Sequence, residues 1–219
     1  MKQLIVALDV KERSKALNLV KMLSPYVDIF KVGPILFLKE GPKLIEEIRE
    51  DGNEVFLDLK FHDIPQTVRR SVESAKELGV YSLTLHSAGG EMMMKEAASV
   101  SGHPRLWAVT VLTSQATDPA VVRERALMAK KSGMDGVISS PHEIEIIKKA
   151  CGSDFGVVTP GIRLESDSKN DQQRIATPGA AIRAGANFIV VGRPIIEAAS
   201  PVDAAKKITE EIEKAITKY

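Results

Sequence analysis

An aspartate and a lysine are separated by one residue in Asp58-Leu59-Lys60, which ends an apolar run. Side chains two apart in a strand project from the same face, so this carboxylate and this ammonium would lie next to each other. An ammonium kept charged by nearby carboxylates can stabilise negative charge on a substrate and donate a proton to it. A purely structural ion pair is the alternative, but burying an ion pair is a poor way to gain stability. The spacing therefore favours a catalytic role for Asp58 and Lys60.

Asp63 follows Lys60 in the same segment and has two interpretations. As part of the charge array, it would add a second carboxylate beyond the lysine. As a helix N-cap, it would precede Pro65 in the first helical turn, and Gln66 would complete a capping box. The two interpretations are compatible, and the sequence leaves both open.

Charged residues also end the first two apolar runs of the chain. Ile5, Ala7 and Asp9 would share one strand face, and Lys31 ends the second run on the face that carries Ile29. A charge among apolar neighbours costs free energy unless it is paired. If these faces point into one interior, alternating charges would converge at its mouth and pair with one another: Asp9, Lys31, Asp58 and Lys60.

The elements that must position these residues alternate between short apolar runs and longer segments with helical periodicity. The predicted strands are Leu4–Asp9, Asp28–Gly33, Val55–Lys60, Ser82–His86, Leu106–Leu112, Gly136–Ser139, Gly156–Thr159 and Asn187–Val191. The predicted helices include Ser14–Leu23, Pro42–Glu50, Pro65–Leu78, Pro119–Ser132, Glu143–Ala150 and Pro201–Lys218. This repeat indicates an α/β protein with a single-domain (β/α)8 TIM barrel over residues 1–219. A doubly wound open sheet is the alternative, but it would usually carry a glycine-rich turn after the first strand, and this chain has Asp9-Val10-Lys11-Glu12 there.

Composition excludes several classes of function. The chain has 30 positive and 29 negative side chains among 219 residues, so a nucleic-acid binder that works by bulk charge is not expected. It carries one cysteine, which rules out an internal disulfide and a multi-cysteine zinc site. No secretory signal or membrane-spanning run is visible, so we expect a cytoplasmic protein without a membrane partner. The histidines do not form a metal set by spacing: His62, His86, His103 and His142.

The last strands predict a phosphate site. Barrels often bind phosphate with the loops after strands seven and eight. Gly192 would let the backbone approach the ligand, and Arg193 could offer two parallel donors to phosphate oxygens. An exposed arginine after a strand is the alternative. The long polar segment 160–174 could be a mobile surface loop, or a lid that closes on phosphate with Gln172 reaching the ligand.

Several motifs, taken in order, resemble the signatures of the orotidine 5′-phosphate decarboxylase family. The most specific is Asp58-x-Lys60-x-x-Asp63-Ile64-Pro65. The others are Ala7-Leu8-Asp9, Lys31-Val32-Gly33, Thr159-Pro160-Gly161-Ile162-Arg163, Asp171-Gln172-x-Arg174 and Val191-Gly192-Arg193-Pro194. They run from residue 7 to residue 194, so the resemblance covers nearly the whole chain.

The resemblance implies conversion of orotidine 5′-monophosphate (OMP) to uridine 5′-monophosphate (UMP) and carbon dioxide in de novo pyrimidine biosynthesis. Lys60 would be the proton donor to C6, and Asp58 would lie next to the substrate carboxylate. Lys31 would pair with Asp58 and touch the ribose, and Asp9 would hold a ribose hydroxyl. Thr113 would contact the ligand near the pyrimidine, although a hydroxyl that caps the following loop fits the sequence equally well. The phosphate would be held by Arg163, Gln172, Gly192 and Arg193.

The resemblance also implies a homodimer with shared active sites. In the family, the residues that match Asp63, Ile64 and Thr67 enter the site of the neighbouring subunit, with the threonine at the ribose. No metal and no organic cofactor are implied.

Two other functions remain open. One is a related barrel enzyme that uses the same Asp-x-Lys-x-x-Asp frame with Mg²⁺ on sugar phosphates, such as a hexulose-phosphate synthase or a keto-gulonate-phosphate decarboxylase. The Ile64-Pro65 continuation and Gln172 argue against it. The other is a non-catalytic barrel that binds a phospho-nucleotide, which would have little need of Asp58, Lys60 and Asp63 together.

Overall fold

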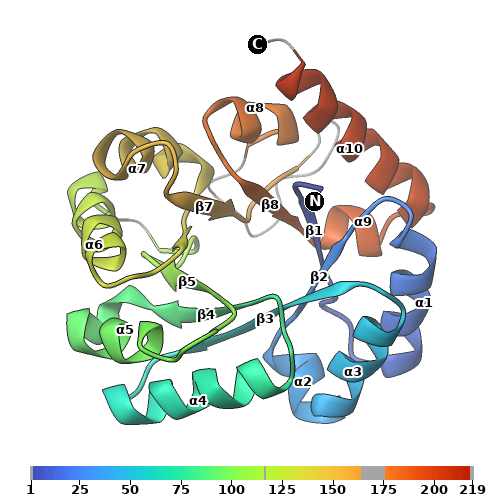
Figure 1. Ribbon diagram of the computed structural model, residues 1–219. Helices are drawn as coiled ribbons and strands as arrows, with labels where there is room; N and C mark the ends of the chain where they lie inside the picture. The colour runs from blue at the N-terminus through green and yellow to red at the C-terminus, as the bar shows by residue number, and fades with distance from the viewer. Residues whose placement is uncertain (1, 116, 164–175, 218–219) are drawn as a thin grey trace.

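The chain forms a closed barrel of parallel strands, and each strand pairs with the next in sequence order until β8 pairs with β1. The computed structural model describes residues 2–115, 117–163 and 176–217. The strands are β1 (Leu4–Ala7), β2 (Ile29–Val32), β3 (Glu54–Phe61), β4 (Ser82–His86), β5 (Arg105–Val109), β6 (Gly136–Ile138), β7 (Gly156–Thr159) and β8 (Phe188–Val191). The predicted (β/α)8 barrel is confirmed, and the open sheet is wrong because β8 closes onto β1 (Figure 1).

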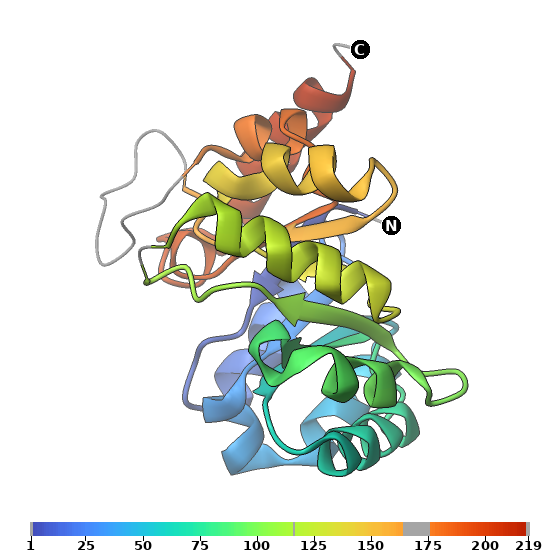
Figure 2. The same cartoon turned by 90° about the vertical axis from the view of Figure 1, so that its left-hand side faces the viewer.

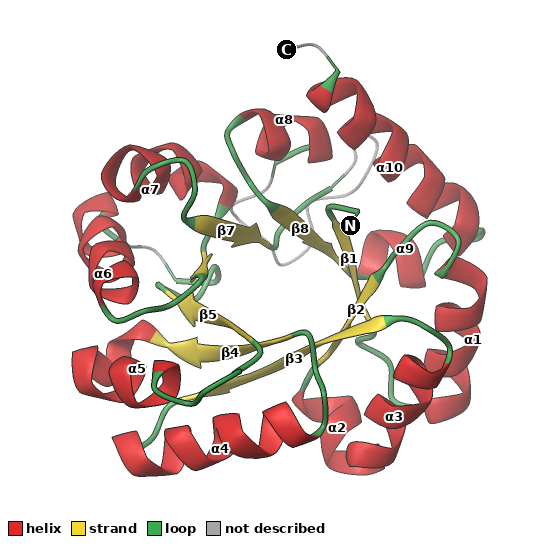
Figure 3. Cartoon of the chain, viewed as in Figure 1, coloured by secondary structure: helices red, strands yellow, loops and turns green. Residues whose placement is uncertain are grey.

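Helices surround the strands on the outside of the barrel (Figure 3). They are α1 (Arg13–Leu23), α2 (Pro34–Glu40), α3 (Pro42–Glu50), α4 (Pro65–Glu77), α5 (Gly90–Ala98), α6 (Pro119–Lys131), α7 (Ile144–Cys151), α8 (Pro178–Arg183), α9 (Arg193–Ile196) and α10 (Pro201–Ile216), with short 3-10 turns at Ser87–Gly89 and Pro141–Glu143. In the side view, α6 and α7 pack next to each other across the outside of the strands (Figure 2). Among the described residues, no helix is both long and apolar enough to cross a membrane.

Alternation along the strands divides the core into two layers. Ile5, Ala7 and Phe56 belong to an inner cluster in the barrel, whereas Leu4 and Val6 belong to the larger outer cluster between strands and helices. This is the period of two expected for strands whose faces are both covered. The predicted inward orientation is therefore confirmed for Ile5 and Ala7 within β1.

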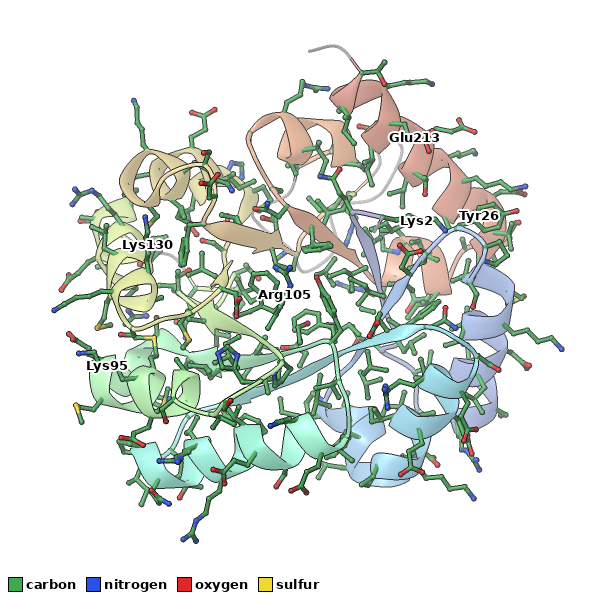
Figure 4. All side chains as sticks on the ribbon, viewed as in Figure 1. Lys2, Tyr26, Lys95, Arg105, Lys130 and Glu213 are labelled. Carbon is green, nitrogen blue, oxygen red and sulfur yellow. The ribbon has the colours of Figure 1, made fainter. Side chains whose placement is uncertain are left out.

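The floor of the barrel is filled by Trp107 from β5. Its indole leaves no space for a side chain at two positions, because a Cβ added at Gly136 or Gly156 would lie 2.6 Å from a ring carbon. Phe188 packs edge-on against the indole at a centroid distance of 6.2 Å. Arg105, labelled in Figure 4, lies at the N-terminal end of β5 with its guanidinium carbon 5.7 Å from the ring centroid of Tyr81. The interior below the strand ends is thus a packed core.

Several strand ends differ from the sequence-based prediction. The ladder of β1 stops at Ala7, so Asp9 follows the strand, and β5 stops at Val109 and not at Leu112. β3 is longer than predicted and runs to Phe61. The strands stop where their chains diverge from their neighbours, and hydrophobicity alone does not report that point.

Candidate active site

A cavity opens at the C-terminal ends of the strands, where barrel enzymes place their chemistry. It is lined by residues from all strands or strand-end loops except those of β4: Ala7, Asp9, Lys31, Phe56, Asp58, Lys60, Val109, Val111, Leu112, Thr113, Ile138, Pro160, Gly161, Arg163, Val190, Gly192 and Arg193. The ammonium-bearing side chain of Lys60 thus faces this cavity. Of the predicted site residues, Asp9, Lys31, Asp58, Lys60, Thr113, Arg163, Gly192 and Arg193 all line it.

Four charged side chains form a continuous chain across the ends of β1, β2 and β3. Lys31 Nζ lies 3.0 Å from Asp9 Oδ1 and 3.3 Å from Asp58 Oδ2. Lys60 Nζ donates to Asp58 Oδ1 at 2.8 Å. Because the charges alternate in sign, each group forms an ion pair with its neighbour, as the two-residue period of the strands predicted. The geometry holds an ammonium at the cavity wall with a carboxylate on one side of it.

Lys31 and Asp58, the two central residues of this row of ion pairs, are largely shielded from water. The side chains of Lys31 and Asp58 are 11% and 12% exposed, compared with 35% for Lys60 and 52% for Asp9. Burial alone would raise the pKa of Asp58, but the ammonium groups of Lys31 and Lys60 outweigh it and the pKa is lowered. Burial alone would lower the pKa of Lys31, but Asp58 and Asp9 keep it raised. Both groups therefore remain charged at neutral pH.

The backbone of Lys60 has an unusual conformation. Its φ is +53°, and among the described residues it is the sole non-glycine with positive φ. The pairing of β3 with β4 shifts register between Leu57 and Phe61, so the lysine sits in a bulge. A non-glycine in this region costs free energy and persists where its surroundings hold it in place, as they do at many functional sites. Asp58 and Lys60 both line the cavity at this irregular part of β3.

Thr84 supports this segment, and the sequence did not predict that it would. Its Oγ1 accepts a hydrogen bond from the Lys60 N–H at 2.9 Å and donates to Asp58 Oδ1 at 2.9 Å. The residue is fully buried on β4, between two leucines that face the outer layer. The available signal was a pair of hydroxyls at alternate positions of β4, Ser82 and Thr84, but only the β3–β4 register shows what Thr84 contacts.

The ends of β7 and β8 bring cationic residues to the part of the rim that adjoins β1. Arg163 and Arg193 line the cavity, and Arg163 is buried with its Nη1 donating to the carbonyl of Ile162 at 2.9 Å. A Cβ added at Gly192 would lie 3.5 Å from Ala7 Cβ and Asp9 Oδ2, so the glycine keeps this part of the rim open. Gln172, predicted to reach the phosphate, lies outside the described residues.

The segment after β3 does not enter this chain's own cavity. Asp63, Ile64 and Thr67 are exposed and are not among the residues that line it. The predicted N-cap and capping box at Asp63 are wrong, because Ile64 holds the N-cap position of α4 and no side chain caps it. The Asp63 carboxylate accepts instead from the adjacent Ile64 N–H at 2.6 Å, and Pro65 removes one of the donors that a cap would serve.

Two histidines lie beside the charge chain without forming a metal site. The rings of His62 and His86 are 5.4 Å apart and tilted by 36°. Burial, the neighbouring His62 and the Lys60 ammonium lower the pKa of His86, so its neutral form is favoured. Within the described ranges, no group of three or more histidine, cysteine or acidic residues could hold a metal ion.

This fold and site define a class: a (β/α)8 barrel whose mouth combines a buried lysine–carboxylate array with arginines after the last two strands. Residues 2–208 match the model of the "Orotidine 5'-phosphate decarboxylase / HUMPS" family, and the chain belongs to this family.

Individual relatives are similar over nearly the full length of the chain. A protein of Syntrophomonas wolfei subsp. wolfei named orotidine 5'-phosphate decarboxylase is 46% identical, covering 97% of this chain and 98% of its own. A protein of the same name from Geobacter sp. is 44% identical, covering 97% and 96%. The crystal structure of orotidine 5'-phosphate decarboxylase from Lactobacillus acidophilus is 38% identical with a TM-score of 0.82, covering 97% of this chain and 99% of that chain.

Proposed function

We propose that the chain decarboxylates OMP to UMP and carbon dioxide in pyrimidine biosynthesis. One observation carries the proposal: Asp9, Lys31, Asp58 and Lys60 form an ion-paired chain at the wall of one cavity. The relatives named orotidine 5'-phosphate decarboxylase support the same substrate. We also propose that the enzyme works in the cytoplasm, which fits its single cysteine.

The reaction needs an ammonium at the carbon that loses carbon dioxide. When the C6–carboxylate bond breaks, its electron pair remains on C6 in an sp² orbital that the ring π-system cannot absorb. The Lys60 ammonium stabilises this charge and then transfers a proton from Nζ to C6, which completes UMP. Because the charge array is preorganised, little reorganisation is needed when the carbanion forms. Solvent returns the proton to the lysine afterwards.

The other members of the array bind the substrate around the reacting carbon. Asp58 lies next to the substrate carboxylate, Lys31 touches the ribose while it pairs with Asp58, and Asp9 holds a ribose hydroxyl. Thr113 contacts the pyrimidine beside an apolar wall that includes Val109 and Ile138. Arg163, Gln172, Gly192 and Arg193 hold the phosphate. Binding energy from the phosphate can thereby be used to hold C6 against Lys60.

The proposed active unit is a homodimer in which each site takes residues from its neighbour. Asp63, Ile64 and Thr67 are exposed and follow the cavity-lining Lys60 along the chain, so a second subunit can contact them. Ile64 is 66% exposed and Met92 is 64% exposed, so covering them with a second subunit would remove apolar surface from water. Their burial in a dimer would bring Asp63 to the partner's Lys60 as a second carboxylate.

The function is tested by mixing pure protein with OMP in the absence of metal and following the loss of orotate absorbance. Conversion to UMP that survives exhaustive chelation supports the proposal. Activity that disappears on chelation and returns with Mg²⁺ would instead favour the sugar-phosphate enzymes of the alternative. Binding of UMP without any turnover of OMP would favour the non-catalytic barrel.

The shared site is tested by mixing two inactive variants. Asp63→Ala subunits lack the donated carboxylate, and Lys60→Ala subunits lack the proton donor. A mixed dimer would contain one intact site, so activity should return to as much as about a quarter of wild type after random subunit exchange, because half of the dimers are mixed and each has one of two sites. No recovery, with subunit exchange demonstrated by mass-tagged chains, would reject the crossover.

A further inference from the structure

Thr84 joins the backbone and the side chain of Lys60 through a single hydroxyl. Its Oγ1 accepts from the Lys60 N–H at 2.9 Å and donates to Asp58 Oδ1 at 2.9 Å. The same Asp58 oxygen accepts from Lys60 Nζ at 2.8 Å. The three residues therefore form a closed ring of hydrogen bonds that begins and ends on the lysine.

The ring lies where the regular strand pairing is interrupted. The β3–β4 register shifts between Leu57 and Phe61, so the Lys60 N–H has no place in the ordinary ladder and bonds to a side chain instead. The left-handed conformation of Lys60, with φ of +53°, needs such support because a side-chain-bearing residue rarely adopts it. The hydroxyl thus holds the bulge in the shape that points the lysine at the cavity.

The ring also fixes the carboxylate that faces the lysine. Asp58 is held by Lys31 from β2 on one oxygen, and by Lys60 and Thr84 on the other. Asp9 lies beyond Lys31, and the half-buried His86 of β4 interacts electrostatically with both Lys60 and Asp58. Of these groups, Thr84 supplies the neutral donor, so it can orient the carboxylate without changing the charge balance.

We infer that Thr84 is a positioning residue that sets the geometry of the Lys60 ammonium and the Asp58 carboxylate for proton transfer. The inference rests on the proposed decarboxylation. Thr84 does not line the cavity, so it acts through these two residues and not by touching the substrate.

The test compares variants that keep or remove the hydroxyl. Thr84→Val preserves the branched shape, and Thr84→Ser preserves the hydroxyl. Ser82→Ala is the matched control, because Ser82 is buried on the same strand face and its hydroxyl has no partner among the described residues. We expect Thr84→Val to lower kcat by about 10- to 100-fold, the range for losing a hydrogen bond to a charged group. Thr84→Ser and Ser82→Ala should stay within about threefold of wild type.

Two further measurements distinguish a positioning role of Thr84 from a purely structural one. UMP affinity of Thr84→Val should remain within about threefold of wild type, because the cavity wall is unchanged. Loss of the hydroxyl donor should also raise the pKa of Asp58, so the acid limb of kcat should move to higher pH in Thr84→Val and stay in place in Thr84→Ser. An acid limb that does not move would reject the contact with Asp58.

Each result separates this inference from the proposed function. A wild-type enzyme that does not convert OMP overturns the decarboxylase itself. An active wild type whose kcat is unchanged by Thr84→Val overturns only the role of Thr84. Should Thr84→Val fail to fold, Thr84→Ala and Thr84→Ser are compared, and equal kcat values for these two would likewise reject the inference.

Discussion

The two halves of the barrel mouth carry different chemistry. The ends of β1, β2 and β3 present four charged side chains that pair with one another, with Thr84 of β4 beneath them. The ends of β5 to β8 present apolar residues such as Val109, Ile138 and Val190, with Arg163 after β7 and Arg193 at the start of α9. One cavity therefore has a charged wall and an apolar wall with a cationic rim.

The difference separates two tasks that one set of residues would perform poorly. A proton donor must be held in a fixed field before the substrate arrives, and opposite charges on adjacent strands achieve this without a ligand. Substrate binding instead needs apolar surface for a ring and cationic donors for a phosphate. We therefore expect damage to the charged half to reduce kcat, and damage to the other half to reduce affinity.

Lys60→Ala tests the charged half most severely. We expect turnover to fall by about 10⁴-fold or more, because the variant loses both an electrostatic stabiliser and a general acid. UMP binding, measured by titration calorimetry, should remain detectable because the apolar wall and the arginines are intact. Lys149→Ala, at an exposed lysine of α7, is the control and should behave as wild type. Near-normal turnover of Lys60→Ala would refute the proton donor.

Asp58→Asn tests whether the charges stabilise the fold as well as the reaction. Removing one partner from a buried ion pair should reduce the free energy of unfolding by about 3 kcal/mol at pH 7. Because the pKa of Asp58 is lowered in the folded state, its contribution is present above the unfolded pKa and is lost as pH falls through the folded value. The difference in free energy of unfolding between wild type and Asp58→Asn, measured by urea unfolding, should therefore become smaller below about pH 4.

The control for this experiment is Asp51→Asn, which removes an exposed carboxylate at the end of α3. Its free energy of unfolding should change by less than about 0.5 kcal/mol at either pH. If the difference in free energy of unfolding between wild type and Asp58→Asn stays constant on acidification, ion pairing of Asp58 does not stabilise the folded protein.

Arg193→Ala tests the other half. Loss of a charged donor to phosphate should lower kcat/KM by about 10- to 100-fold, mainly through a higher KM. Arg105→Ala is the matched control, since this arginine lies at the opposite end of the barrel (Figure 4). A fall in kcat with unchanged KM would contradict the division of labour between the two halves.

Sequence reasoning was most reliable where a local period decides the outcome. Side chains two apart share a strand face, so Asp9, Lys31, Asp58 and Lys60 could be placed on one interior before the fold was known. The arginine after β8 could be placed because the strand before it is short, apolar and unambiguous. The role of Asp63 was harder to predict, because an aspartate two residues before a proline fits both a helix cap and a ligand contact.

Thr84 shows where such reasoning ends. Nothing near Thr84 in the sequence indicates that it contacts residues 58 and 60, because that contact depends on the register between β3 and β4. The left-handed conformation of Lys60 is equally hidden, since a lysine has no intrinsic preference for it. Both features arise from the bulge, which is a property of two paired strands.

By itself, the sequence determined the eightfold repeat, the inward parity of the charged residues and the family, because each of these depends on order and spacing along one chain. The tertiary structure decided which oxygen meets which nitrogen, which hydroxyl supports the lysine, and that Asp63 lies outside its own cavity. The physical reason is that hydrogen bonds act over about 3 Å, whereas the register and tilt that bring their atoms together come from packing of the whole barrel.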